Sequence, residues 1–403
     1  MTDLLLLSKD TPIAQIINGT VQPILPERLP LFLQRFGDAL AWLASRAIDS
    51  HRTNSRLLKR ALRLESRDDL TAVLSVNAVT ITDNYWVKPL DDTTTRYADV
   101  RYKVNRFDNL ALTGDANSFD QPPERTPELT NTGSYEKCWR LVEDKGNANA
   151  FSDIQDIVTE KNTLQSEQRI ERVPAGDARW WMIKDGRPEE LFSELLISRI
   201  AEVLGFPVAR YAPEGNFIKS RDFTDNASVD FESAAGISGE TVDYIKIYEA
   251  LKPFGEQITD RYLQMCYLDA LVFNMDRHEN NFGVLRDSDT GKVLSLAPFF
   301  DHNIALVSRN YPLNVQAEND RLITDFTELA RYAQRPMRVH ELTKTDFEKL
   351  VREIPWELPM SDTVDNPRQF VVQYLLNRQA RLKELNRETV IFQIKKPKNR
   401  DAQ

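Results

Sequence analysis

The sequence contains only two cysteines and four histidines in 403 residues. Neither Cys138 nor Cys266 has a second cysteine at C-x-x-C spacing, which argues against a disulfide framework and a cysteine-rich zinc site. Both lie in apolar or aromatic stretches, as buried thiols of a reducing compartment do. The N-terminal MTDLLLLSKD has only four consecutive leucines, too few for a signal peptide or a membrane span. We therefore expect a cytoplasmic protein.

A surplus of positive charge is also missing. The formal net charge is −9 and the pI is about 5.3. Sequence-independent nucleic-acid binding depends on Lys and Arg that neutralise phosphates, so we expect no direct nucleic-acid binding and no membrane association. Hydrophobic residues make up 41% of the chain and no low-complexity tract interrupts them. The chain can therefore bury a sizeable core as one large domain or as two to three smaller ones.

Glycine-rich phosphate motifs are absent, because neither G-x-x-x-x-G-K-[ST] nor G-x-G-x-x-G occurs. A less glycine-rich candidate is T-N-T-G-S-Y-E-K at 130–137, which contains Gly133 and several hydroxyl residues. We predict a strand, a turn and a second strand over 130–144. Backbone N–H groups in such a turn can hold phosphates, and Lys137 adds a positive charge. The alternative is a plain hairpin.

The segment F-N-M-D-R-H-E-N-N-F-G at 273–283 is polar, although it follows an apolar helix expected at 258–274. Asp276 and Asn281 within it form D-x-x-x-x-N. In a phosphotransferase catalytic loop, such an aspartate accepts the proton of the attacking hydroxyl and the asparagine binds magnesium. The alternative is that these polar groups only cap a helix end.

Two short strands, in FGVLRD and VLSLAPFFD, are predicted after this loop, joined by the turn SDTGK. A hairpin of this kind returns Asp301 to the end where Asn281 lies. Mg²⁺ prefers oxygen ligands from few carboxylates together with substrate phosphate, so Asp301 is a candidate ligand. For His278 and His302, a hydrogen bond that braces the loop is favoured over metal binding. The order of these residues is that of protein kinases, with D-H-N where D-F-G usually stands.

A kinase also needs an upstream lysine on a strand that contacts the phosphates. Lys184 ends the strand expected at 178–186, and the helix expected at 187–206 carries Glu194, which could orient it. The alternatives are a solvent-exposed lysine and a solvent-facing glutamate.

Elsewhere the pattern predicts helices over 27–64, extended structure over 71–88, two strands over 208–223 and mostly helices over 315–391.

These motifs resemble the HipA-like serine/threonine kinases. L-D-A-L-V-F-N-M-D-R-H-E-N-N-F-G-V-L and the later L-A-P-F-F-D-H-N are similar to the catalytic and metal-binding motifs of that family. G-S-Y-E-K is similar to its phosphate loop, and W-M-I-K followed by S-E-L-L is similar to its lysine–glutamate pair. The resemblance covers about 128–390. D-R-H-x-x-N also occurs in phosphatidylinositol kinases, which share the general fold.

The resemblance implies ATP and Mg²⁺ as cofactors and gives each motif residue a role. Asp276 corresponds to the general base, with His278 in the same loop, while Asn281 and Asp301 correspond to the magnesium ligands. Lys184 corresponds to the lysine that contacts the ATP phosphates. The other nucleotide-binding positions that it implies are Gly133, Ser134, Lys137, Glu194 and, at the adenine hinge, Phe223.

Regulation is also implied by the resemblance, because toxins of this family can phosphorylate a serine near the phosphate loop. The corresponding candidates here are Thr130 and Ser134. A toxin–antitoxin role with a regulatory protein partner is a further expectation. Residues 1–125 do not obviously match those toxins, and Glu279-Asn280 replaces a basic residue often found before the asparagine. These departures weaken the expectation of an antitoxin and affect nucleotide affinity or substrate choice.

The sequence thus predicts an α+β fold of the bilobal kinase type. We expect an N-terminal accessory domain at 1–125, a small β-rich ATP-binding lobe at 126–225, a helical catalytic lobe at 226–395 and a frayed tail at 396–403.

The predicted function is a serine/threonine protein kinase whose substrate is a protein with a Ser or Thr acceptor. One alternative is a catalytically silent kinase fold that serves as an interaction or regulatory protein. The other is a lipid kinase, which the acidic pI and the lack of a basic amphipathic helix disfavour.

Overall fold

The computed structural model describes 3–48, 52, 54–64, 69–114, 125–143, 178–335, 337 and 339–395, with side chains described up to 385. The chain divides into two compact units, each built from separate segments. The first, called the β-rich unit below, comprises 1–186, 209–239 and 282–298. The second, called the helical unit, comprises 187–208, 240–281 and 299–403.

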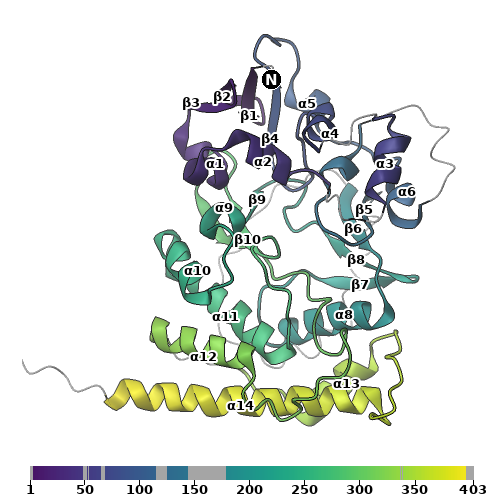
Figure 1. Cartoon of the computed structure of the whole chain (residues 1–403), viewed down its shortest axis with the longest axis vertical. Coiled ribbons are helices and arrows are strands. Elements are labelled where there is room, and N and C mark those ends of the chain that lie inside the picture. The colour runs from purple at the N-terminus through teal and green to yellow at the C-terminus, as the bar shows by residue number, and fades with distance from the viewer. Residues whose placement is uncertain are drawn as a thin grey trace, which may run out of the picture. The chain divides into compact units, whose positions relative to one another are not determined.

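Antiparallel sheets form the frame of the β-rich unit (Figure 1). One sheet has the order β3-β2-β1-β4, from Thr20–Pro23, Thr11–Ile17, Leu4–Ser8 and Tyr85–Pro89. Another has the order β5-β6-β8-β7, from Lys137–Glu143, Ala178–Lys184, Phe217–Arg221 and Tyr211–Glu214. The third has the order β11-β10-β9, from Val293–Leu296, Gly283–Arg286 and Asp230–Ser233. Short helices connect them: η1 (Pro26–Arg28), α1 (Leu31–Phe36), α2 (Ala39–Ser45), α3 (Ser55–Ala61), α4 (Asp69–Ser75), α5 (Tyr97–Val100), α6 (Asp108–Thr113), η3 (Pro127–Thr130) and α9 (Ala235–Ser238).

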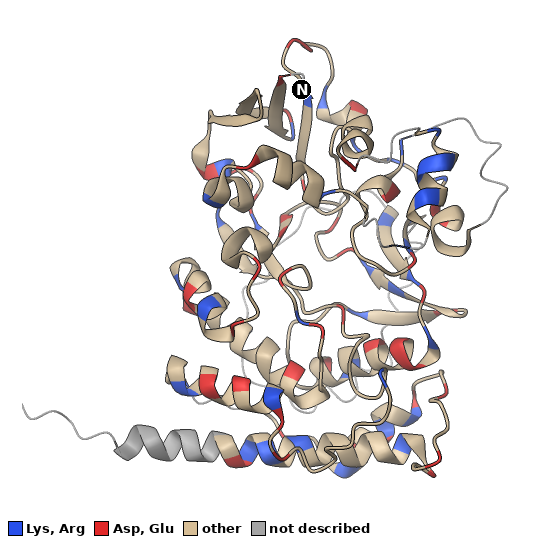
Figure 2. Cartoon of the chain, in the orientation of Figure 1, with Lys and Arg blue, Asp and Glu red and all other residues tan. Residues whose placement is uncertain are grey.

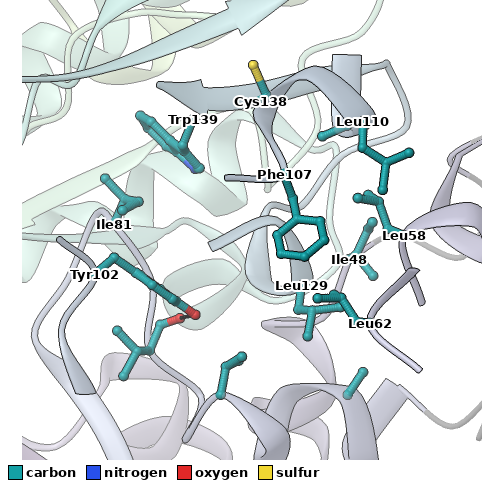
Figure 3. Close-up of a cluster of buried hydrophobic side chains, with 14 of the residues drawn as sticks. Ile48, Leu58, Leu62, Ile81, Tyr102, Phe107, Leu110, Leu129, Cys138 and Trp139 are labelled. Atoms are coloured by element: carbon teal, nitrogen blue, oxygen red, sulfur yellow. Dashed lines mark hydrogen bonds between the residues drawn. The ribbon is translucent and has the colours of Figure 1, made fainter. Parts of the chain in front are cut away.

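One hydrophobic core joins the N-terminal segment to the strands that follow it (Figure 3). Leu58 on α3 and Phe107 before α6 pack in the same buried cluster as Trp139 on β5 and Trp180 on β6. Because burial of apolar surface is the main stabilising contribution, this shared core places 1–125 and the next strands in one compact unit. The domain boundaries expected at 125 and 225, and with them an N-terminal accessory domain at 1–125, stay predictions.

The helical unit is built around α11 (Glu256–Val272), which contacts α12 (Arg321–Ala333) and α14 (Pro367–Lys395). In Figure 2 the acidic positions of α12 lie between basic ones, and Arg321 and Asp325 form an ion pair of 3.4 Å. The other helices of the unit are α8 (Pro188–Val203), α10 (Tyr244–Leu251), η5 (Lys252–Phe254) and α13 (Lys344–Arg352). In the described residues, none of the helices combines the length and the hydropathy needed to cross a membrane.

The α+β fold class is confirmed, and most predicted elements of the kinase-like region are present. The strand expected at 178–186 is β6, and the helix at 187–206 is α8, whose Pro188 and two early glutamates suit a helix start. The two strands at 208–223 are β7 and β8, and the hairpin after the polar loop is β10 and β11. The tail at 396–403 lies outside the described residues.

Two predicted extended segments are wrong. The stretch 71–88 begins in helix α4 and becomes extended only at β4, because Ala72, Val73 and Val76 are buried at helical spacing. Its many β-branched residues reflect burial rather than a strand, since β-propensity depends on context. The first strand expected within 130–144 is also wrong, because the described residues 130–132 are not extended into a strand before Gly133. The helical turn η3 ends at Thr130, whose hydroxyl donates to the Val79 carbonyl at 2.7 Å.

The helices expected over 27–64 are present but interrupted. Gly37 has a φ of +67° and ends α1, and Asp38 then starts α2 by accepting a hydrogen bond from Ala41 N at 2.9 Å. Between 226 and 258 the sequence is polar and mixed, and no element was predicted; the structure has β9, α9, α10 and η5 there.

Asp230 is a fully buried carboxyl group in the β-rich unit. Its Oδ1 accepts hydrogen bonds from the Asn84 backbone N–H at 2.9 Å and from Asn84 Nδ2 at 2.7 Å. Burial, with the nearby charges of Asp83 and Glu232, raises the pKa of Asp230 to about 7. Between about pH 4 and pH 7, the folded chain therefore holds a proton that the unfolded chain has released.

We expect the free energy of unfolding to fall as the pH rises through this window, by about 1.4 kcal/mol per unit of pKa difference. Asp230→Asn replaces the protonated carboxyl by an amide of the same shape and should remove this part of the pH dependence. Urea unfolding of both proteins from pH 4.5 to 8 measures the difference directly. Identical pH slopes in the two proteins would contradict the assignment of a raised pKa to Asp230.

Candidate active site

The polar segment 273–283 begins where helix α11 ends. Phe273 is the C-cap residue, with a φ of +57°, and its N–H donates to the Asp269 carbonyl. A left-handed backbone costs about 1–2 kcal/mol for a residue with a side chain. The Phe273 ring offsets this cost by packing against Tyr374 at 6.1 Å and under the Arg378 guanidinium at 4.9 Å. The helix therefore stops at a defined residue, and the polar loop starts there.

The loop is closed on itself through the backbone of Asp276. The Asp276 carbonyl accepts hydrogen bonds from His278 N at 3.0 Å and from Asn281 Nδ2 at 2.9 Å. His278 Nδ1 accepts from Asn280 N at 3.2 Å, which is the bracing contact expected for this histidine. None of these bonds uses the Asp276 carboxylate, which stays half-buried at the start of the loop.

Arg277 is the main support of the loop, and its side chain is only 4% exposed. It forms a two-pronged ion pair with Asp269, at 2.8 Å from Nε and 3.0 Å from Nη2. Burial by itself lowers the pKa of the guanidinium, but the carboxylates of Asp269 and Asp301 raise it above its ordinary value. Its Nη1 donates both to the Asn281 carbonyl and to the Phe300 carbonyl, at 2.8 Å for Phe300. A single nitrogen thus links the residue at the loop's end to the residue before Asp301.

The Asp301 segment runs beside the same loop. Leu306 N donates to the Val272 carbonyl at 2.9 Å, and Met275 N donates to the Ile304 carbonyl at 3.1 Å. Asp301 has a φ of +60°, a left-handed conformation in which aspartate is enriched. The sequence prediction that the hairpin returns Asp301 to the end where Asn281 lies therefore matches this geometry.

Glu194 on α8 is fully buried, and one of its oxygens accepts a hydrogen bond from His302 N at 2.9 Å. Within the helical unit, Glu194 thus supports the backbone next to Asp301. Its expected role in orienting Lys184 stays a prediction.

The donor atoms of this region fit a magnesium ion. Because Asn281 Nδ2 is bonded to the Asp276 carbonyl, the amide oxygen of Asn281 is the atom left for a ligand. Asp301 supplies carboxylate oxygens, and both are hard ligands of the type Mg²⁺ takes. Among the described residues, no group of three or more His, Cys, Asp or Glu side chains is arranged to hold a metal. A site with two protein ligands completed by substrate phosphate is compatible with that finding.

In the β-rich unit, two lysines stand directly opposite each other. The register of β5 and β6 pairs Lys137 with Lys184, and Lys184 is 8% exposed. The Lys184 ammonium lies 5.2 Å from the centre of the Tyr135 ring, within the range of a cation–π contact. Gly133 has a φ of +102°, and a Cβ there would collide with Lys137 Nζ. The turn 133–136 is therefore folded against both lysines.

The start of this turn is fixed by Glu128, a fully buried carboxylate. Glu128 accepts from Trp139 N at 2.8 Å and from Asn131 Nδ2 at 2.9 Å. Burial raises the pKa of Glu128, and the nearby Arg52 partly opposes this. This carboxylate joins η3, the turn and β5.

Three other predicted positions differ in their surroundings. Thr130 is buried and its hydroxyl is engaged in the bond to Val79, whereas Ser134 is exposed. Phe223 is half-buried and packs edge-to-face on Phe231 at 5.4 Å. Its assignment to an adenine hinge stays a prediction.

Sequence reasoning did not single out Arg277, Asp269, Glu128 or Tyr135. The one available signal for Arg277 and Asp269 was a pair of opposite charges eight residues apart, across the end of an apolar helix. Because an arginine between polar residues is usually solvent-exposed, nothing marked it as buried.

Comparison with known families gives one sequence match. Residues 157–356 match the family model described as the HipA-like C-terminal domain, which agrees with the predicted resemblance. A comparison with curated protein sequences finds no match.

Two solved structures are similar to the chain at low identity. The proinflammatory kinase CtkA of Helicobacter pylori is 15% identical, with a TM-score of 0.38, and the alignment covers 53% of this chain and 92% of that chain. A chain of the Shewanella oneidensis MR-1 toxin–antitoxin complex of HipA, HipB and operator DNA is 12% identical, with a TM-score of 0.47. That alignment covers 94% of this chain and 97% of that chain. On the family match, residues 157–356 of the chain belong to the HipA-like C-terminal domain family.

Proposed function

We propose that the chain is an ATP- and Mg²⁺-dependent protein kinase that transfers the γ-phosphate to a Ser or Thr hydroxyl. The observation that carries this proposal is the contact of Arg277 Nη1 with both the Asn281 and the Phe300 carbonyls. This contact holds the D-x-x-x-x-N loop and the Asp301 segment together. We further propose, from the family resemblance, that the lysine pair of the β-rich unit binds the phosphates of ATP.

Asp276 has the role of orienting the acceptor hydroxyl and taking its proton. Its carboxylate suits this role because it lies half-buried at the start of a loop whose shape is fixed by hydrogen bonds to the Asp276 carbonyl. In phosphoryl transfer most of the catalysis is positioning and charge stabilisation, so a fixed loop is the main requirement.

Lys137 and Lys184 have the role of binding the phosphates. Like charges placed directly opposite on neighbouring strands repel each other, and a bound polyanion offsets this repulsion because it attracts both lysines. Gly133 supports this role because the Lys137 ammonium lies directly over it, at the start of the proposed phosphate turn. Bound Mg²⁺ supplies neutralisation of phosphate charge, and Asn281 and Asp301 are the residues that would hold it.

Asp301→Asn is expected to remove the Mg²⁺-dependent part of ATP binding. The variant keeps the shape of the side chain but loses the carboxylate. We expect the dissociation constant for ATP in Mg²⁺ to rise about tenfold or more, a loss of about 1.4 kcal/mol or more, because the ion loses a carboxylate ligand. Calorimetric titration with ATP, with and without Mg²⁺, measures this.

The matched control is Asp325→Asn, which removes a carboxylate of α12 that forms an ion pair with Arg321. We expect it to bind ATP like the wild type. An Asp301→Asn variant with unchanged Mg²⁺-dependent binding would remove Asp301 from the proposed metal site.

Autophosphorylation and a regulatory protein partner are further parts of the proposal, and both rest on the family resemblance. Of the two candidate hydroxyls, Ser134 is the better acceptor, because it is exposed while Thr130 is buried and hydrogen-bonded. Finding no phosphate on 130–134 in active preparations would remove autophosphorylation from the proposal.

A further inference from the structure

The hairpin 283–296 is bound along one side by the N-terminal segment, although more than 200 residues of sequence separate them. Arg286, at the end of β10, is 1% exposed. Its Nη1 donates to the Leu29 carbonyl at 2.9 Å and to the Tyr85 hydroxyl at 3.1 Å, and its Nη2 donates to the Glu27 carbonyl at 3.0 Å. A strand of the hairpin is thereby fixed to the backbone of the N-terminal segment.

Glu232 on the neighbouring strand β9 completes this attachment. It stands opposite Val284 in the sheet register and forms an ion pair with Arg286. Its carboxylate also accepts from Leu31 N at 2.5 Å and from the Tyr85 hydroxyl at 3.0 Å. One buried carboxylate therefore holds β9, β10 and the N-terminal segment together.

The turn of the hairpin is held by the same segment. Arg28 donates to the Ser288 carbonyl at 2.8 Å, and Lys9 forms an ion pair with Asp289 at 3.0 Å. Gly291 has a φ of +72°, and a Cβ there would collide with the Glu27 carbonyl. We call residues 27–31, together with Tyr85, the clamp.

A buried network of charged groups contributes little net stability to a fold. Taking an arginine and a glutamate out of water costs several kcal/mol for each ion, and well-packed apolar residues often stabilise as well. What a fully bonded buried network adds is one defined geometry. The clamp therefore fixes where the hairpin lies rather than merely burying surface.

We propose that the clamp is a positioning device for the two proposed magnesium ligands. β10 begins two residues after Asn281, and β11 ends five residues before Asp301. The backbone between Asn281 and Asp301 runs through the hairpin. Holding the hairpin in place therefore restricts the positions of the residues on either side of it. Arg286 is then a positioning residue, and the N-terminal segment supports the site through it. This inference rests on the proposed function.

The test is Arg286→Met in the full-length chain, with Arg125→Met as the matched control. Arg125 is half-buried in the β-rich unit and donates to Asn77 Oδ1 and to the Val76 carbonyl at 2.7 Å, both outside the hairpin. Hydrogen exchange of the 283–296 amides is measured first, and it needs no activity. The Mg²⁺ concentration at half-maximal ATP binding, kcat and KM for ATP are measured next.

We expect Arg286→Met to speed hydrogen exchange of the 283–296 amides. The Mg²⁺ concentration at half-maximal ATP binding should rise about tenfold. The value of kcat should fall, while KM for ATP at saturating Mg²⁺ should change little. Arg125→Met should lose stability without these changes. Equal exchange at 283–296 in both variants would overturn the clamp, and equal Mg²⁺ midpoints would overturn its positioning role. A wild type that binds no ATP would refute the proposed function instead, and the exchange result would still decide whether the clamp holds the hairpin.

Discussion

Asp276→Ala is expected to lower the turnover number about 10²–10⁴-fold, the usual contribution of a positioned acid–base group. Binding of ATP should stay nearly unchanged, because Asp276 serves the acceptor hydroxyl and not the nucleotide. The loop should also stay folded, since His278 and Asn281 bond to the Asp276 carbonyl and not to its side chain. Steady-state kinetics and ATP titration of the purified variant give the two quantities.

The control for Asp276→Ala is Asp260→Ala, a surface carboxylate of α11 that pairs with Arg335. It should keep wild-type turnover. If Asp276→Ala also keeps it, Asp276 is not the base, and the D-x-x-x-x-N loop has only the role of a helix cap.

Arg277→Met is expected to have the largest effect on stability, lowering the free energy of unfolding by about 3–5 kcal/mol. The reason is that the variant leaves the buried Asp269 carboxylate without its two-pronged partner. It also removes the donor shared by the Asn281 and Phe300 carbonyls, so activity should fall even below the unfolding temperature. Urea unfolding and kinetics on the same preparation measure both effects.

A second variant separates these two roles of Arg277. The double change Arg277→Met with Asp269→Leu removes both charges, and such replacements of buried ion pairs are often neutral or stabilising. We expect it to recover much of the lost stability but not the activity. Recovery of both would show that Arg277 only supports the fold and does not position the Asn281 and Asp301 segments.

The sequence predicted the parts of this site that depend on local order. The spacing of Asp276 and Asn281, the hairpin after them and the return to Asp301 are all short-range features, because turn chemistry and strand alternation act within a few residues. Lys184 was placed at the end of a strand for the same reason, and β6 ends there.

What sequence reasoning missed depends on contacts between distant segments. In the sequence, Arg286 stands in a short predicted strand, and nothing nearby indicates that it is buried. Its hydrogen-bond partners Leu29 and Tyr85 are more than 200 residues away in the sequence. The helix α4 was predicted as extended because Val and Thr favour strands, yet packing against the core decided the outcome. Periodicity reports which residues are buried, but it does not report what they are buried against.

The measurement that tests the central claim most directly is incubation of the purified chain with γ-labelled ATP and Mg²⁺, beside Asp276→Ala and Asp301→Asn, followed by phosphosite mapping. The account predicts label on Ser or Thr in the wild type, of the chain itself or of an added protein acceptor, and little or none with either variant. Label of equal strength in all three proteins would contradict the proposed site. Absence both of label and of Mg²⁺-dependent ATP binding in the wild type would contradict the proposed kinase activity.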